Sequence, residues 1–247
     1  LEMKRMQKKQ TSLNLTLVGH LADLRKRVII SGLALIIFSF LGYYFAEPIA
    51  KDIVSRAPDM DFVFISPSEL MLSYIRIAVY CGLIIGAPII LSQIWLFVSP
   101  GLEAKHKRYV VLALFLGSGF FILGAVFSYL IVLPVIFKFF AGFQLPEIQA
   151  AISFANYLNF VISILLAFGL VFELPIIMYL LTRLGLLKVD FFTRNRKYMV
   201  LIIFFVAALL TPPDVISQTL LALPMLGLYE LGILLSRVGQ KNKKKCI

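Results

Sequence analysis

The stretch RKRVIISGLALIIFSFLGYYFA, residues 25–46, decides how the rest of this chain is interpreted. Three consecutive basic residues, Arg25 to Arg27, lead directly into an apolar run from Val28 to Ala46. A run of about 19 residues crosses a hydrocarbon core of roughly 30 Å at about 1.5 Å per residue. Basic residues beside such a run mark the end that stays in the cytoplasm. The stretch therefore predicts a membrane-spanning helix that enters from the cytoplasmic side.

The composition of the whole chain favours a polytopic membrane protein. Hydrophobic residues make up 60% of the 247 residues and charged residues 15%, whereas a soluble domain carries about 25% charged residues. The net charge of +11 would suggest nucleic-acid binding in a soluble protein. Here the charges fall in predicted loops, so they indicate topology and no nucleic-acid partner is expected. Cys81 and Cys246 match no disulfide framework or metal cluster, and no metal or cofactor is expected.

Hydrophobic windows predict an all-α fold of six membrane-spanning helices. The predicted spans cover residues 28–46, 71–97, 109–137, 154–181, 198–210 and 215–235. The last two are separated by a Pro-Pro turn at 211–214, which makes them a hairpin of two crossings. The fifth span is short, at about 20 Å of helix. Residues 1–237 are predicted to form one membrane domain, and 238–247 a basic cytoplasmic tail.

The positions of lysine and arginine predict that both termini lie in the cytoplasm, as expected for a plasma-membrane protein. Twenty of the 24 fall in the segments that six spans place on one side: 1–27, 98–108, 182–197 and 236–247. Arg76 and Lys138 lie near span ends, where they can reach the interface. The first outer segment, 47–70, is instead rich in acids. Residues after Pro48 are predicted to form a short interfacial helix, and the segment is either a functional outer cap or a solvated loop.

Polar residues inside the fourth span are candidates for function, because an ionisable group in a span is costly. At 100° per residue, Asn159, Ser163 and Glu173 fall on one helix face. Such a stripe turns away from lipid, toward a groove or another protein. The alternative, for Asn159 and Ser163, is that they only hold helices together through buried hydrogen bonds.

Two more acids lie at the ends of the sixth span. Asp214 follows the Pro-Pro turn and precedes a helix, so its carboxylate can cap the first free N–H groups of that helix. The alternative is a functional polar cluster with Gln218, one turn further on. Glu230 lies near the inner end, where it is predicted to pair with Arg237 or to lie near water.

Four segments carry a resemblance to a known family. They are residues 20–27 (HLADLRKR), 87–102 (APIILSQIWLFVSPGL), 167–175 (AFGLVFELP) and 210–224 (LTPPDVISQTLLALP), with Tyr229-Glu230 beyond. In this order they resemble TatC, the receptor subunit of the twin-arginine protein translocase. The resemblance runs from residue 20 to about 237, and the six-span topology agrees with it.

The resemblance implies a concave, glove-shaped helical scaffold that does no chemistry. Proteins of this family bind the signal peptide of a folded cargo, which bears two consecutive arginines. They then recruit single-span TatA/TatB-type partners, and the proton-motive force drives export. The chain has no Gly-x-x-x-x-Gly-Lys phosphate loop, in agreement with that energy source. Several copies are expected to assemble within a larger complex.

A site for two arginines needs acids on an otherwise basic face, because the planar guanidinium favours bidentate carboxylate partners. The main acids of the predicted inner face are Asp23, Glu103 and Asp190. The family usually has Glu at the position of Asp23. Its acid in the first cytoplasmic loop falls on His106, so that charge is missing here, and Glu103 is expected to replace it.

The matched positions imply further roles. The resemblance places signal-peptide binding on Asp23, Arg25, Arg27, Phe97, Glu103 and His106. It places Pro48 in an outer cap that supports translocation. The short fifth span resembles a docking surface for a partner helix, where Gln218 and Glu173 would offer hydrogen bonds. Asn159 and Asp214 complete this intramembrane polar set.

Two rival functions come from other classes. A proton-coupled secondary transporter of a small solute would use Glu173 and Asp214 as a proton relay, although no convincing repeated halves are found. An intramembrane serine protease would use Ser118 in the Gly-Ser-Gly of the third span. Both histidines, however, lie in cytoplasmic segments, so no span supplies its base. Close helix packing explains the Gly-Ser-Gly better, and the chain is not expected to be an enzyme.

Overall fold

The structure is a computed structural model that describes residues 2–57, 61–98, 107–142, 151–211 and 214–244. Its helices are α1 (Glu2–Tyr44), α2 (Ala46–Ser55), α3 (Pro67–Val98), α4 (Lys107–Phe127), α5 (Leu133–Ala141), α6 (Phe154–Leu184), α7 (Val189–Arg194), α8 (Arg196–Leu210) and α9 (Val215–Lys244). A π-helical turn, η3 (Ser128–Val132), joins α4 to α5. Two short strands, β1 (Asp61–Val63) and β2 (Ala151–Ser153), complete the described fold. The prediction of an all-α architecture is confirmed.

Five of the predicted spans correspond to helices long and apolar enough to cross a membrane. These stretches are Leu21–Tyr44, Pro67–Ile94, Leu114–Ala141, Phe154–Leu184 and Val215–Val238. The remaining predicted span, the fifth, is α8, which has only 15 residues. Its length is about 22 Å at 1.5 Å per residue, roughly 8 Å less than a typical hydrocarbon core. The predicted hairpin is also present, since α8 ends at Leu210 and α9 begins at Val215.

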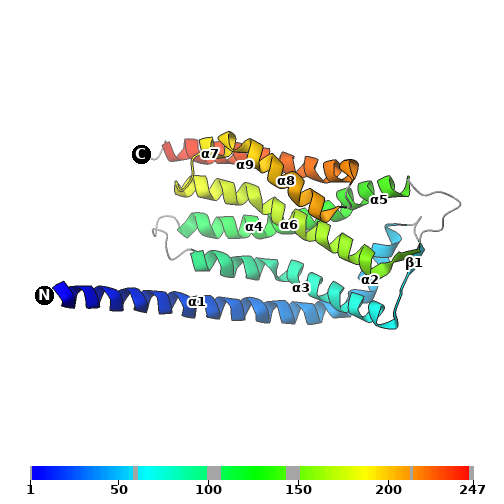
Figure 1. Cartoon of the computed structure of the whole chain (residues 1–247), viewed down its shortest axis with the longest axis horizontal. Coiled ribbons are helices and arrows are strands. Elements are labelled where there is room, and N and C mark those ends of the chain that lie inside the picture. Colours follow the sequence, from blue (N-terminus) through cyan, green and yellow to red (C-terminus); the bar gives the residue numbers. More distant parts are fainter. Residues whose placement is uncertain (1, 58–60, 99–106, 143–150, 212–213, 245–247) are drawn as a thin grey trace.

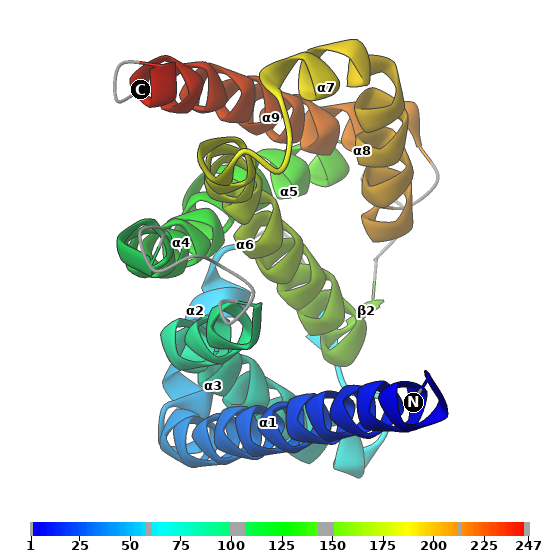
Figure 2. The same ribbon diagram turned by 90° about the vertical axis from the view of Figure 1, so that its left-hand side faces the viewer.

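The helices pack in a spatial sequence that places α6 at the centre. Figure 1 shows the long helices side by side, and packing neighbours follow the order α1, α3, α4, α6, α9 and α8. Seen end-on in Figure 2, they follow a curve with α1 and α8 toward its two ends, in agreement with a concave scaffold. Half of the α6 span is buried, against 11% of the α1 span. The core therefore forms around α6, and α1 is a peripheral helix held mainly by α3.

Both termini lie at the same end of the bundle, which is the left-hand end in Figure 1. We call this the inner end, and the opposite end, with α2 and β1, the outer end. This arrangement agrees with the prediction that both termini lie on one side of the membrane. Which side of the membrane that is stays a prediction.

Prolines shape the long helices. Pro88, Pro175 and Pro224 lie inside α3, α6 and α9. Pro134 lies in the first turn of α5, directly after the π-helical turn η3. Proline has no backbone N–H to donate, so the chain near Pro134 cannot keep the regular α-helical bonding pattern. A single π-helical turn is a common local adjustment in a helix.

The outer end contains structure that the sequence did not predict. Strand β1 pairs in parallel with β2, with Phe62 opposite Ile152. Glu69, in the first turn of α3, holds the same two segments together. Its Oε1 accepts hydrogen bonds from Ser153 Oγ at 2.5 Å and from the Ala155 N–H at 3.1 Å. Its Oε2 accepts one from the Ile65 N–H at 2.7 Å.

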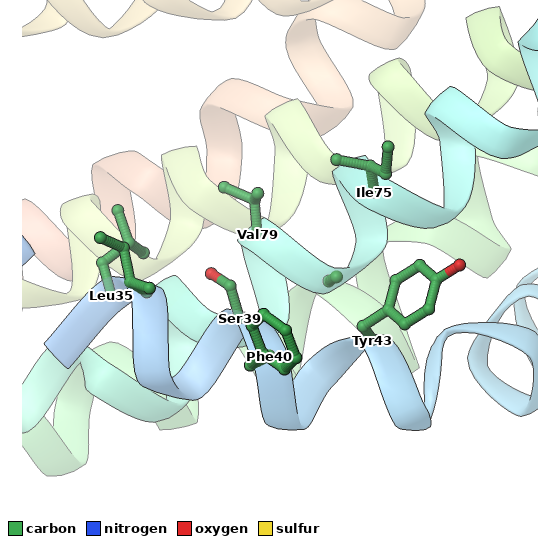
Figure 3. Close-up of a pocket in the computed structure, with 8 residues that line it drawn as sticks. Leu35, Ser39, Phe40, Tyr43, Ile75 and Val79 are labelled. Carbon is green, nitrogen blue, oxygen red and sulfur yellow. The ribbon is translucent and has the colours of Figure 1, made fainter. Parts of the chain in front are cut away.

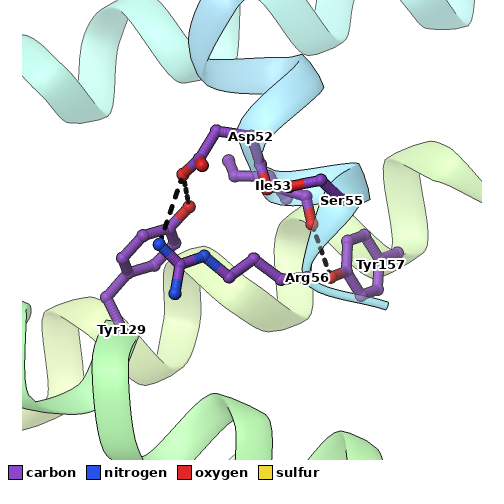
Figure 4. A network of polar contacts seen from close by, with 6 residues as sticks. All are labelled: Asp52, Ile53, Ser55, Arg56, Tyr129 and Tyr157. Carbon is purple, nitrogen blue, oxygen red and sulfur yellow. Dashed lines mark hydrogen bonds and ion pairs between the residues drawn. The ribbon is translucent and has the colours of Figure 1, made fainter. Parts of the chain in front are cut away.

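The outer cap, residues 46–57 and 61–66, is fixed to the helices by α2. The Tyr129 hydroxyl donates to the Asp52 carboxylate, and the Arg56 guanidinium lies 4.4 Å from the centre of the Tyr129 ring (Figure 4). The buried Tyr157 hydroxyl donates to the Ile53 carbonyl at 2.9 Å. The short helix predicted after Pro48 is confirmed, and the solvated-loop alternative is wrong for the described part of this segment.

Candidate functional site

The first candidate acid, Asp23, lies on the inner half of α1. Arg27 Nε donates to Asp23 Oδ2 at 2.9 Å, one helical turn further along the same helix. Such i, i+4 pairs are local and are worth about 0.2–0.5 kcal/mol. Arg25, between them, is exposed. A foreign guanidinium that binds Asp23 would therefore share this carboxylate with Arg27 or displace Arg27 from it.

The other predicted signal-peptide residues are only partly visible. Phe97 lies in the last turn of α3 and is half-buried. Glu103 and His106 lie outside the described residues, so the predicted replacement of the missing acid by Glu103 stays a prediction. The inner end of α3 and the inner half of α1 lie at the same end of the bundle (Figure 1). The structure thus brings the Asp23 and Phe97 segments to one end of the molecule.

Among the predicted site acids that the structure describes, Glu173 is the most deeply buried, with 4% of its surface exposed. Its Oε1 has no hydrogen-bond partner among the described residues. A Cβ atom added to Gly117 of α4 would lie only 2.7 Å from Glu173 Oε2. The carboxyl group therefore points from α6 toward α4 and occupies the space that this glycine leaves.

The predicted polar stripe of the fourth span is not a single site. Asn159 is exposed and accepts a hydrogen bond from Arg76 Nη1 of α3 at 3.0 Å. Asn159 thus joins α3 to α6 through an exposed hydrogen bond, not the buried one that the structural alternative expected, whereas Glu173 lies fourteen residues further along α6 against Gly117. The guanidinium of Arg76 has a side-chain partner on α6 that the sequence did not predict, while its reach to the interface stays a prediction. A charged residue in a largely apolar helix is the signal that should have prompted a search for that partner.

Asp214 acts as the N-cap of α9. Its Oδ1 accepts a hydrogen bond from the Ser217 N–H at 2.7 Å, and its Oδ2 accepts one from the Ser217 hydroxyl. These two bonds stabilise the carboxylate and hold the pKa of Asp214 below its usual value. Gln218 has a different role, since its Nε2 donates to the Phe204 carbonyl of α8 at 2.9 Å. The capping prediction is confirmed, and Gln218 serves to tie α9 to α8.

The short helix α8 presents an apolar face. Leu201, Phe205 and Leu209 follow one another at intervals of one helical turn, and each is at least 64% exposed. At the start of α8, Arg196 Nη2 lies 2.8 Å from Glu230 Oε2 of α9. Glu230 therefore pairs with Arg196 of α8 rather than with Arg237, and it is exposed, in agreement with the alternative prediction of a position near water. The face that bears Leu201 is suited to contact lipid or another apolar helix.

Pro48 lies in the first turn of α2 and is exposed. Proline is well tolerated there because the first N–H groups of a helix have no partner within it. On the same helix, Lys51 Nζ donates to Glu47 Oε1 at 2.7 Å. This pair lowers the pKa of Glu47 and raises the pKa of Lys51. Pro48 thus lies in the first turn of the helix that carries the Asp52 and Ile53 contacts of the outer cap.

An open groove of about 440 Å³ lies between α1 and α3. Figure 3 shows Leu35, Phe40, Ile75 and Val79 around it, with the Tyr43 hydroxyl as one of its few polar groups. The groove belongs to two predicted spans, so hydrocarbon is its natural surrounding. In the part of the chain that the structure describes, no three His, Cys, Asp or Glu side chains gather in a way that could hold a metal ion.

These features define an all-helical polytopic membrane protein with a basic inner end, a structured outer cap and a buried carboxyl group. The profile described as "Sec-independent protein translocase protein (TatC)" matches residues 19–224. The TatC protein of Desulforapulum autotrophicum is 40% identical over 229 residues, which cover 91% of this chain and 85% of that protein. That of Aquifex aeolicus is 38% identical over 93% of this chain and 98% of its own length.

A solved structure of a TatC protein also matches this chain. The crystal structure of the twin-arginine translocase receptor TatC matches with a TM-score of 0.80 at 35% identity, over 89% of this chain and 99% of that one. The chain belongs to the TatC family. Members of this family are components of a protein translocase and are not enzymes. Membership therefore confirms protein translocation over a solute transporter or a protease.

Proposed function

We propose that this chain is the signal-peptide receptor of a twin-arginine translocase in the plasma membrane, with both termini in the cytoplasm. It binds the paired arginines of a folded protein's signal peptide at its inner end. It then recruits single-span TatA/TatB-type partners for export driven by the proton-motive force. Family membership supports the general role, and the excess of basic residues in the inner segments supports the orientation.

The observation that carries the binding proposal is the Asp23 carboxylate on a strongly basic segment. Arg25, Lys26 and Arg27 follow it closely in sequence, and it is already bound by a guanidinium at 2.9 Å. A carboxylate that accepts Arg27 in this geometry can accept the guanidinium of a peptide in the same way. Phe97, half-buried at the inner end of α3, would offer apolar contact to the peptide beside the arginines.

The partner helices are proposed to dock on α8. Its apolar face around Phe205 is exposed. Helices in lipid associate through close packing and hydrogen bonds rather than through exclusion of water. The short length of α8 also favours thinning of the bilayer beside it. Further copies of this chain are proposed to join the same complex.

Binding of a labelled Arg-Arg signal peptide to the purified full chain tests this proposal. Asp23→Lys should weaken binding by about tenfold or more, since a hydrogen bond to a charged group contributes about 1.5–3 kcal/mol. Glu103→Lys should weaken it if Glu103 supplies the second acid. Asp190→Lys, an equal change of charge on the exposed part of α7, is the control. Equal binding of a Lys-Lys peptide, together with no effect of Asp23→Lys, would overturn the proposed site.

A further inference from the structure

The seam between α4 and α6 is built from glycines that face large side chains. A Cβ on Gly124 would lie 2.6 Å from the Phe168 carbonyl oxygen and 2.8 Å from Phe172 Cγ. A Cβ on Gly169 would lie 2.8 Å from Cε2 of the buried Phe121. The two helices therefore approach each other more closely than larger residues would allow.

Gly117 belongs to the same seam, seven residues before Gly124 and thus on the same face of α4. Its neighbour across the seam is the Glu173 carboxyl group. The added Cβ would lie 2.7 Å from Oε2 and 3.3 Å from Oε1. Elsewhere in the seam a glycine faces a ring or the backbone, but here it faces the end of a flexible, polar side chain.

The direction of Glu173 follows from this contact. Pro175, two residues further along α6, faces the opposite way, because its Cα would lie 3.2 Å from a Cβ on Gly232 of α9. Glu173 is thus held on the α4 side of α6, whereas Gln218 joins α9 to α8. Its Oε1 is buried and has no hydrogen-bond partner among the described residues. Among these residues, therefore, no hydrogen bond to Oε1 holds the carboxyl group in place.

We propose that Gly117 is a positioning residue, which gives the Glu173 carboxyl group its place between α4 and α6. A side chain at position 117 pushes that carboxyl group out of the seam toward the surface of α6. The helices need not separate, because the carboxyl end of a glutamate can rotate away while a backbone carbonyl cannot. The role of this position in transport rests on the function proposed above, whereas the positioning itself does not.

Three alanine substitutions in α4 separate positioning from packing. Gly117→Ala meets the movable carboxyl group, Gly119→Ala meets nothing within 4 Å, and Gly124→Ala meets the Phe168 backbone. The measurement is the rate at which a carbodiimide probe labels Glu173 in the detergent-purified full chain, followed by mass spectrometry of the Glu173 peptide. Glu173→Gln supplies the background. Melting temperature is recorded for every variant.

Gly117→Ala should label Glu173 several-fold faster than the unsubstituted chain, with a melting temperature close to that of Gly119→Ala. Gly119→Ala should label at the original rate. Gly124→Ala should lower the melting temperature, which shows how damage to the seam differs from a displaced carboxyl group. The proposal is overturned if Gly117→Ala labels like Gly119→Ala, or if its faster labelling comes with the same loss of stability as Gly124→Ala.

Export of an Arg-Arg precursor from cells then tests whether the position is used. Gly117→Ala should reduce export several-fold, and it should have no further effect when Glu173 is already alanine. An additive loss in the double variant would mean that Gly117 acts independently of Glu173, which contradicts the proposal. If Glu173→Ala exports normally, the partner-contact role of Glu173 fails, while the labelling result still decides the role of Gly117.

Discussion

At the outer end of the bundle, polar side chains join segments that lie far apart in the sequence. Tyr129 bonds Asp52, 77 residues away, and Ser153 bonds Glu69, 84 residues away. At the inner end, by contrast, Arg27 bonds Asp23 within a single helix. The outer cap is therefore fixed by tertiary structure, whereas the charge pair of α1 is local. A local pair can open without unfolding anything else, which suits a surface that must exchange its own arginine for that of a peptide.

The largest expected effect lies under the outer cap. Tyr157→Ala removes a buried ring whose centre is 4.6 Å from that of Phe62 and 5.0 Å from that of Phe137. We expect the free energy of unfolding in detergent to fall by about 3–5 kcal/mol. Tyr157→Phe, which loses only the bond to the Ile53 carbonyl, should cost about 1 kcal/mol. Tyr43→Ala on the exposed part of α1 is the control, and an equal loss there would break the contrast between the two regions.

Glu69→Ala tests whether one carboxylate joins the segments of the outer end. It removes the acceptor of three hydrogen bonds from Ile65, Ser153 and Ala155. We expect a lower melting temperature and faster proteolysis within the outer cap. Glu47→Ala is the matched control, because Glu47 is exposed and pairs with Lys51 on its own helix. Similar melting temperatures for the two variants would mean that the Glu69 contacts do not hold the cap.

Acid should weaken the outer end through Asp214. Its folded-state pKa lies below the ordinary value of 3.8 because Ser217 stabilises the carboxylate. The stabilisation is therefore present above about pH 4 and is lost as the pH falls through the lowered pKa. Asp214→Asn keeps an N-cap and should show a smaller decrease of melting temperature below pH 4. If the melting temperatures of Asp214→Asn and of the unsubstituted chain fall equally below pH 4, this contribution of Asp214 is excluded.

The smallest effect is expected at the inner end. Arg27→Gln frees the Asp23 carboxylate from a pair worth about 0.2–0.5 kcal/mol, so an Arg-Arg peptide should bind about twofold more tightly. Lys26→Gln, which changes the charge equally at a neighbouring exposed position, should not tighten binding. Titration of the labelled peptide at constant salt measures both. Weaker binding of the Arg27→Gln variant would show that Arg27 contacts the peptide itself. The contrast between the local charge pair of α1 and the tertiary contacts of the outer cap would then need a different explanation.

Much of the fold could be predicted because membrane spans are local in sequence. The apolar run after Arg27 and the Pro-Pro turn before Asp214 gave the spans and the final hairpin without any tertiary information. The N-cap at Asp214 was also predictable, since its partner Ser217 lies three residues away. The parallel pairing of β1 with β2 was missed because each strand has three residues and a distant partner.

The candidate site was predicted less completely, since residue identity does not reveal which way a helix is rotated against its neighbours. Asn159 and Glu173 were correctly placed on α6. The sequence did not show that Asn159 meets Arg76 and that Glu173 meets Gly117. Gln218 was likewise assigned to a polar face, while its partner is a backbone carbonyl of α8. Every residue has a backbone carbonyl, so the identity of a residue does not show that its carbonyl will accept such a bond.

The sequence alone determined the membrane class, the spans and the family of this protein. Each of these depends on hydrophobicity, charge or motifs read along the chain. Only the tertiary structure decided that α6 is central, that α1 is peripheral, and that the Glu173 carboxyl group lies against Gly117. The physical reason is that a helix turns by 100° per residue. Which of its sides is buried therefore depends on the neighbours that pack against it.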